Sequence, residues 1–204
     1  GLILLCVSLF RKRKIKQGIG IISISISLFL YSFTDPNVMN LAFIAFQPNV
    51  ITSWDANYFY VESKGIPTTH DMMFGIASNG WQQQVPISQP YIDNNSWSIP
   101  LQPAYAATPL STKTNLMKGA VAVAVNGIPI FNALNNRGED SYLIGELDNW
   151  GGHCGRGDDY HYHAAPLHLS TTSGLKPIAF ALDGFPVYGS KEPDGSSMIA
   201  LDSC

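Results

Sequence analysis

The chain has 204 residues and a mass of 22.2 kDa, with 46% hydrophobic but only 13% charged residues. Average soluble domains carry about 25% charged residues, and 18 glycines and 13 prolines argue against a long helical bundle. Five of the twelve basic residues lie in the first 16 positions, whereas all 15 acidic residues come after position 34. The body of the chain therefore carries a net charge of −8, which repels phosphate backbones and disfavours nucleic-acid binding.

Residues 1–34 have the pattern of a targeting segment. A basic run at residues 11–16 precedes an apolar stretch at residues 18–33, as in a secretory signal peptide. The stretch is slightly shorter than the roughly 20 residues of a membrane-spanning helix. We predict a signal peptide, a membrane anchor or a mis-assigned leader at residues 1–34, followed by a domain at residues 35–204. The domain is then secreted, periplasmic or attached to the cell envelope, with possible membrane attachment through the first segment.

Two cysteines lie within the predicted domain, Cys154 and Cys204. In an oxidising compartment they would either form a disulfide or remain two unrelated thiols, and the sequence leaves both alternatives open.

Strand patterns dominate the body of the chain. Aromatic and β-branched residues at 57–62 predict one strand. Valines alternate with alanines at residues 121–125, with the period of two expected of a strand. Asn126 and Gly127 follow and form a strong hairpin signal. Pro129 cannot donate a hydrogen bond to a neighbouring strand, which predicts a sheet edge there. The fold class is therefore mainly β, with α+β as the alternative, and with long loops.

One hairpin pattern occurs twice. Residues 122–131 have the sequence AVAVNGIPIF, and residues 179–188, displaced by 57 positions, have the sequence AFALDGFPVY. This match predicts two repeated hairpin units. A Leu-Asp pair follows each unit at a similar distance, but a histidine-rich segment follows only the first pair. We therefore expect the second unit to be truncated and the natural protein to continue beyond Cys204 with another histidine segment.

Four of the five histidines fall within 16 residues: His153, His161, His163 and His168. On an extended strand, His161 and His163 project from one face, and Tyr160 and Tyr162 project from the other. Imidazole pairs of this kind chelate transition metals, and copper or zinc fits better than calcium, which prefers oxygen ligands. We expect His168 to complete the site and His153 to fold back over it from a glycine-rich loop.

Asp158 and Asp159 are candidate oxygen ligands or partners that orient an imidazole. In an alternative function, a metal-assisted hydrolase, one of them is the general base that deprotonates a metal-bound water. A further alternative is a non-catalytic surface or adhesion module, in which alternating tyrosines and histidines form a structural hydrogen-bond network. His70 lies outside the cluster, and we expect a surface or capping residue there unless the fold brings it to the site.

The chain resembles the YHYH-domain family, which is named after the string found here at residues 160–163. The matching segments are residues 126–131, 145–169 and 177–189, with weaker likeness at residues 62–76 and 81–86. The resemblance implies a secreted or envelope protein, commonly with a second C-terminal histidine unit. It implies no particular reaction and no catalytic residues.

Overall fold

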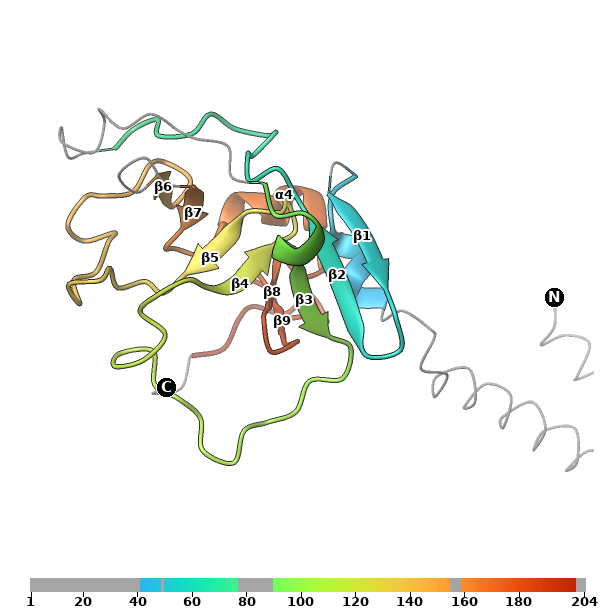
Figure 1. Ribbon diagram of the computed structural model, residues 1–204. Coiled ribbons are helices and arrows are strands. Elements are labelled where there is room, and N and C mark those ends of the chain that lie inside the picture. The colour runs from blue at the N-terminus through green and yellow to red at the C-terminus, as the bar shows by residue number, and fades with distance from the viewer. Residues whose placement is uncertain (1–40, 49, 77–89, 155–158, 201–204) are drawn as a thin grey trace, which may run out of the picture. The chain divides into compact units, whose positions relative to one another are not determined.

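The computed structural model describes residues 41–48, 50–76, 90–154 and 159–200, all of which belong to one unit, Met39–Cys204 (Figure 1). The predicted leader at residues 1–34 lies outside the described residues. The described residues form two β-sheets, with short 3-10 segments and one helical turn, α4 (Ser170–Ser173). The mainly β fold is therefore confirmed. Within the described part of the chain, no helix has the length and apolar character needed to cross a membrane.

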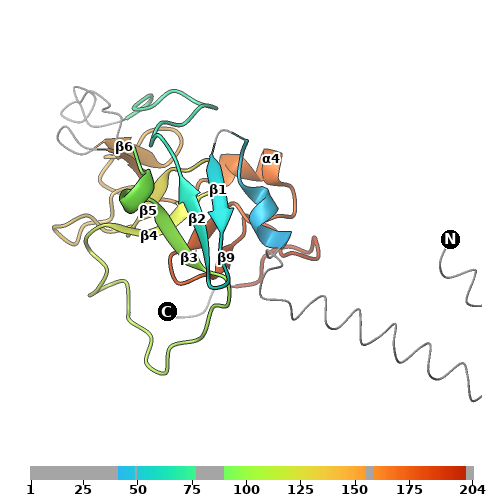
Figure 2. The ribbon, with the colours of Figure 1, turned by 45° about the vertical axis from the view of Figure 1, so that its right-hand side comes forward.

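The smaller sheet is an antiparallel meander of three strands. It contains β1 (Ile51–Trp54), β2 (Tyr58–Glu62) and β3 (Trp97–Pro100) in that order. The strand predicted at residues 57–62 is confirmed as β2. Figure 2 shows this sheet in front of the strands of the larger sheet.

The larger sheet has the order β6-β7-β5-β4-β8-β9. Its strands are β4 (Ala120–Ala124), β5 (Pro129–Phe131), β6 (Gly152–Cys154), β7 (Tyr160–Tyr162), β8 (Ala179–Ala181) and β9 (Pro186–Val187). All neighbours are antiparallel except β5 and β7, which pair in parallel at Ile130 and Tyr162. The sheet edge predicted at Pro129 is therefore wrong. Proline is tolerated there because it is the first residue of β5, and the pairing with β7 is made one residue later.

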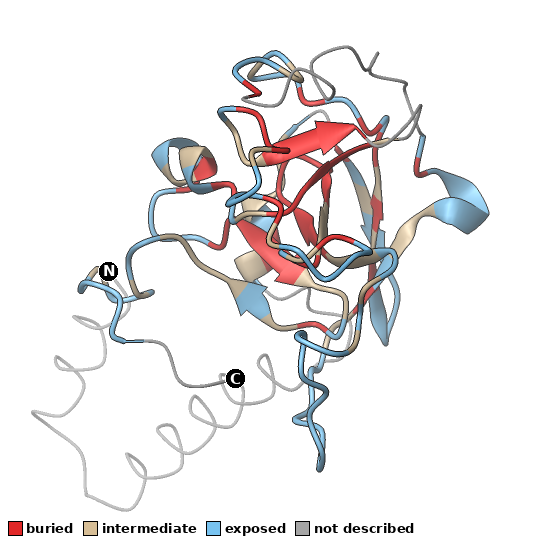
Figure 3. Ribbon diagram, turned by 90° about the vertical axis from the view of Figure 1, so that its left-hand side faces the viewer, coloured by how far each residue is buried: buried red, intermediate tan, exposed pale blue. Residues whose placement is uncertain are grey.

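Aromatic stacking joins the two sheets. Phe43, on the 3-10 segment η1 (Leu41–Ala45), stacks on Phe59 of β2 and on Phe180 of β8, with ring centroids 4.1 and 4.4 Å apart. All three rings are at most 3% exposed. The buried residues concentrate in and around the strands of the larger sheet (Figure 3). The histidine-bearing strands β6 and β7 thus belong to a sheet that is anchored on a packed core.

The two predicted hairpins exist and are related by a local two-fold symmetry. In the pairing of β4 with β8, Val123 lies opposite Phe180, its own equivalent in the repeat, and the flanking alanines pair crosswise. Each hairpin turn needs a glycine with a positive φ, 81° at Gly127 and 100° at Gly184. A Cβ at Gly127 would also come within 2.5 Å of the Ser63 side chain, so the turn packs closely against the chain beyond β2.

The repeat extends further than the sequence match. A bridge between Leu134 and Asp140 recurs, 57 positions later, between Lys191 and Ser197. The backbone hydrogen bonds of the first loop, including Asn135 to Glu139, also recur at the same displacement. Only one residue type is shared between these loops, the glycine at 138 and 195. The loop after the second hairpin therefore has the same backbone conformation as the loop after the first hairpin, although the two loops share almost no side chains.

Candidate metal site

Strand register brings three histidines together. His153 on β6 lies directly opposite His161 on β7, and His163 follows two residues after His161. The three rings pack edge to face, with each pair of ring centroids 4.9 Å apart. We call His153, His161 and His163 the histidine trio. The prediction that His153 lies in a loop is wrong: it is on a strand, and antiparallel pairing puts it on the same face as its opposite residue.

Backbone carbonyl groups fix the tautomer of each ring. Nδ1 of His153 bonds the carbonyl oxygen of Glu146 at 3.0 Å, and Nδ1 of His161 bonds that of Asp159 at 3.0 Å. Nδ1 of His163 bonds the carbonyl oxygen of Asn132. Because a carbonyl oxygen only accepts, each Nδ1 carries the proton and each Nε2 carries the lone pair. Histidines that bind metal ions are oriented in the same way by bonds from their second nitrogen.

The ligand nitrogens of the trio converge. One nitrogen from each ring lies within 4.8 Å of the others, and Nε2 of His161 is 3.1 Å from Nε2 of His163. Burial lowers the pKa of His153 to about 3 and the pKa of His161 to about 4, because desolvation and neighbouring imidazolium charge disfavour protonation. Burial also lowers the pKa of His163. The trio is therefore neutral at physiological pH and could hold a metal ion.

A pocket of about 180 Å³ lies beside the trio. Glu146, only 3% exposed, lines it and receives hydrogen bonds from Arg137 Nη2 at 2.7 Å and Asn135 Nδ2 at 3.3 Å. Its negative charge acts to raise the pKa of His153 and of His163, against the larger effect of burial. Sequence analysis missed Glu146 because it stands outside the histidine-rich segment and matches no ligand spacing.

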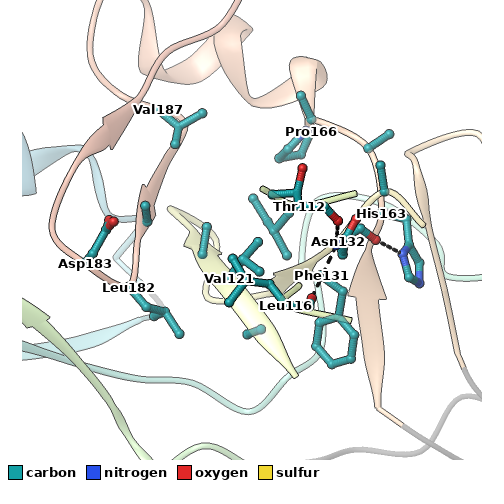
Figure 4. A pocket seen from close by; sticks show the side chains of 17 residues that line it. Thr112, Leu116, Val121, Phe131, Asn132, His163, Pro166, Leu182, Asp183 and Val187 are labelled. Atoms are coloured by element: carbon teal, nitrogen blue, oxygen red, sulfur yellow. Dashed lines mark hydrogen bonds between the residues drawn. The ribbon is translucent and has the colours of Figure 1, made fainter. Parts of the chain in front are cut away.

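Asn132 and Phe131 support the trio from β5 and the residue after it. The Phe131 ring stacks on His161, with centroids 4.1 Å apart and an interplanar angle of 19°. Phe131, Asn132 and His163 also line a larger groove of about 740 Å³, formed mainly by apolar side chains from both hairpin units (Figure 4). The Asn132–His163 bond therefore lies between the groove and the small pocket.

His168 is not brought to the trio. It lies on the 3-10 segment η3 (Leu167–Leu169), and its ring centroid is 5.9 Å from that of Tyr162, on the tyrosine face of β7. Its nearest ring partners are His70 at 5.0 Å and Trp150 at 5.2 Å. Burial lowers the pKa of His168 to about 4. The chain turns at Pro166 and carries His168 across the sheet, which strand periodicity alone did not show.

The tyrosines of the motif form a hydrogen-bond network. The Tyr162 hydroxyl accepts a bond from Asn126 Nδ2 at 3.0 Å and donates to His70 Nε2 at 2.8 Å. The Tyr160 hydroxyl donates to Asp148 Oδ2 at 2.7 Å, and burial raises the pKa of both tyrosines. His70 thus reaches β7 from a distant part of the sequence. The tyrosines of the motif therefore form a hydrogen-bond network on one face of β7. Its histidines lie on the other face, where their nitrogens converge.

The remaining predicted residues lie apart from the trio or outside the described residues. Asp158 and Cys204 are outside them, so both alternatives for Cys154, which is buried in the core, stay open: a disulfide with Cys204 or an unrelated thiol. The Asp159 carboxylate accepts a hydrogen bond from the Tyr91 hydroxyl, and its carbonyl group orients His161. Asp159 therefore orients a histidine of the trio through its backbone carbonyl group, whereas its carboxylate bonds Tyr91.

The structure thus defines a two-sheet β domain in which three convergent, buried imidazoles could hold a metal ion. The sequence profile of the family described as YHYH protein matches residues 96–202, slightly more than half of the chain. The chain belongs to this family. The match includes the strands β3 to β9 and the whole histidine trio. A search of curated proteins and a search of solved structures found no match.

Proposed function

We propose that this protein binds one transition-metal ion, copper or zinc, through Nε2 of His153, His161 and His163. The observation that supports this most strongly is the 3.1 Å contact between two Nε2 atoms that both carry lone pairs. Such lone pairs repel one another, burial opposes an imidazolium proton between them, and a cation relieves the repulsion. The all-nitrogen donor set suits copper or zinc better than calcium.

The proposal includes a secreted, periplasmic or envelope location. The support is the basic and then apolar pattern of residues 1–34, which is typical of export signals and of membrane anchors. A ligand set of imidazoles without thiolates also functions in an oxidising compartment, because imidazole is not oxidised to a disulfide.

Metal loading of the full chain tests this function. After expression with copper or zinc supplementation and removal of free metal, we expect elemental analysis to find about one equivalent of ion per chain. Bound ion should also raise the free energy of unfolding, by about 4 kcal/mol at a thousandfold excess over the dissociation constant. Less than about a tenth of an equivalent of any transition metal would reject the proposal.

Metal-assisted hydrolysis is the second candidate function. The observation in its favour is that the trio supplies only three ligands and lies beside a pocket lined by the buried carboxylate of Glu146. When a metal ion is bound, it lowers the pKa of a coordinated water, and a neighbouring carboxylate is suited to accept the proton. Glu146 is preferred to Asp159 as the base, because it lines the pocket. Asp158 lies outside the described residues and stays a candidate base.

The substitution Glu146→Gln tests the hydrolase alternative. We expect it to lower metal-dependent cleavage of 4-nitrophenyl acetate by about a hundredfold, with metal content unchanged. Glu139→Gln, which changes the other carboxylate bound to Arg137, is the matched control and should retain the rate. Equal rates for wild type and Glu146→Gln, or no metal-dependent cleavage at all, would remove this alternative.

A further inference from the structure

We infer that Met117 is a fourth ligand beside the histidine trio and that the site therefore selects copper(I) over zinc(II). This inference rests on the proposed function, since it concerns the same site and specifies its metal. Thioether sulfur is a soft donor that favours copper(I). Zinc sites in proteins use thiolate, imidazole and carboxylate ligands instead.

The location of Met117 is the first support. Met117 is half-buried and lines the 180 Å³ pocket together with all three imidazoles. Among the described residues that line this pocket, it is the one that carries sulfur. The pocket therefore combines three neutral nitrogen donors with one thioether.

Asn132 Nδ2 contacts the Met117 sulfur, but two backbone carbonyl groups lie nearer to it. Asn132 Nδ2 lies 2.7 Å from the Thr112 carbonyl oxygen and 3.1 Å from that of Asn115. It lies farther, at 3.4 Å, from both the Leu116 carbonyl oxygen and Met117 Sδ. An amide group has two hydrogens, and the two nearer carbonyl groups take them. Asn132 thus holds the segment before Met117 in place without needing the sulfur.

Asn132 also connects the segment before Met117 to the trio. The carbonyl group of Asn132 accepts the bond from His163 Nδ1, while its side chain holds the chain at Thr112 and Asn115. Asn132 is only 6% exposed, so both sets of contacts are fixed within the fold. A single buried residue, Asn132, therefore links the segment that precedes Met117 to His163.

The backbone just before Met117 is strained. Leu116 has a φ of 60° although it is not glycine, and its side chain is 45% exposed. A left-handed conformation is unfavourable for a leucine, because its Cβ comes too close to the following carbonyl oxygen. The two neighbouring side chains then lie on different sides: Leu116 lines the 740 Å³ groove, and Met117 lines the 180 Å³ pocket. A requirement to present Met117 to the trio accounts for this strain.

The test compares Met117→Leu with the wild-type full chain. Leucine keeps the volume and apolar character of methionine but removes the sulfur. We expect the substitution to weaken copper(I) binding by about tenfold or more, measured by competition with bicinchoninate under reducing, oxygen-free conditions. Zinc(II) affinity, measured with a chromophoric chelator, should change by less than about threefold. Met198→Leu alters another half-exposed methionine, which lines neither cavity, and should change neither affinity.

X-ray absorption of the copper(I)-loaded wild type gives a second measurement that does not depend on folding of the variant. A sulfur atom in the first coordination shell supports the inference, and a shell of nitrogen and oxygen alone overturns it. Equal copper(I) affinities of wild type and Met117→Leu, or an equal loss of zinc(II) affinity, also overturn it. If the wild type binds zinc(II) and copper(I) without sulfur, the proposed function stands and only the role of Met117 fails. If the wild type binds neither ion, both fail.

Discussion

Substitution of His161 by glutamine is expected to abolish metal loading of the protein. His161 holds the central place in the trio: it lies opposite His153 across the β6–β7 pair and 3.1 Å from His163, measured between the Nε2 atoms. Its loss leaves two imidazoles, which form a much weaker chelate. We expect bound metal to fall from about one equivalent to less than a tenth, and affinity to fall by about a hundredfold or more, as determined by elemental analysis and titration calorimetry.

His168→Gln is the matched control for this substitution. His168 belongs to the same sequence cluster, but it lies on the tyrosine face of β7 beside His70 and Trp150. The variant should retain one equivalent of metal with nearly unchanged affinity. Loss of metal in His168→Gln together with retention in His161→Gln would show that the ligands are not those that the strand register brings together.

Replacement of Asp148 by alanine is expected to have the largest effect on stability. The carboxylate is 7% exposed and accepts hydrogen bonds from the Tyr160 hydroxyl and from the backbone N–H groups of Met73, Trp150 and Gly152. Its removal leaves two buried and two partly buried donors without their acceptor, which costs about 3–5 kcal/mol in free energy of unfolding. Urea denaturation of the metal-free protein measures this loss without a contribution from bound ion.

Two variants calibrate that result. Tyr160→Phe removes one of the four donors and should cost about 1 kcal/mol. Asp194→Ala removes an exposed carboxylate that accepts a hydrogen bond from the Ser196 backbone, and it should leave the midpoint of urea denaturation nearly unchanged. A cost below about 1 kcal/mol for Asp148→Ala would contradict the structural role that we assign to this carboxylate.

The sequence by itself determined the features that depend on local periodicity. Alternating valines and alanines predict β4, and the Asn-Gly and Asp-Gly turns predict both hairpins, because each signal lies within a few neighbouring residues. The same period of two places His161 and His163 on one face of a strand. Local periodicity was therefore sufficient to assign two of the three imidazoles of the trio to a common face.

Tertiary structure alone decided which other residues join the site. His153 joins the trio through the register of β6 against β7, and Glu146 and Met117 line the neighbouring pocket from segments that carry no ligand spacing. His168 lies on the tyrosine face of β7 and not beside the trio, because the chain turns at Pro166. These outcomes depend on strand pairing and on packing between residues far apart in the sequence, and local patterns contain no information about either.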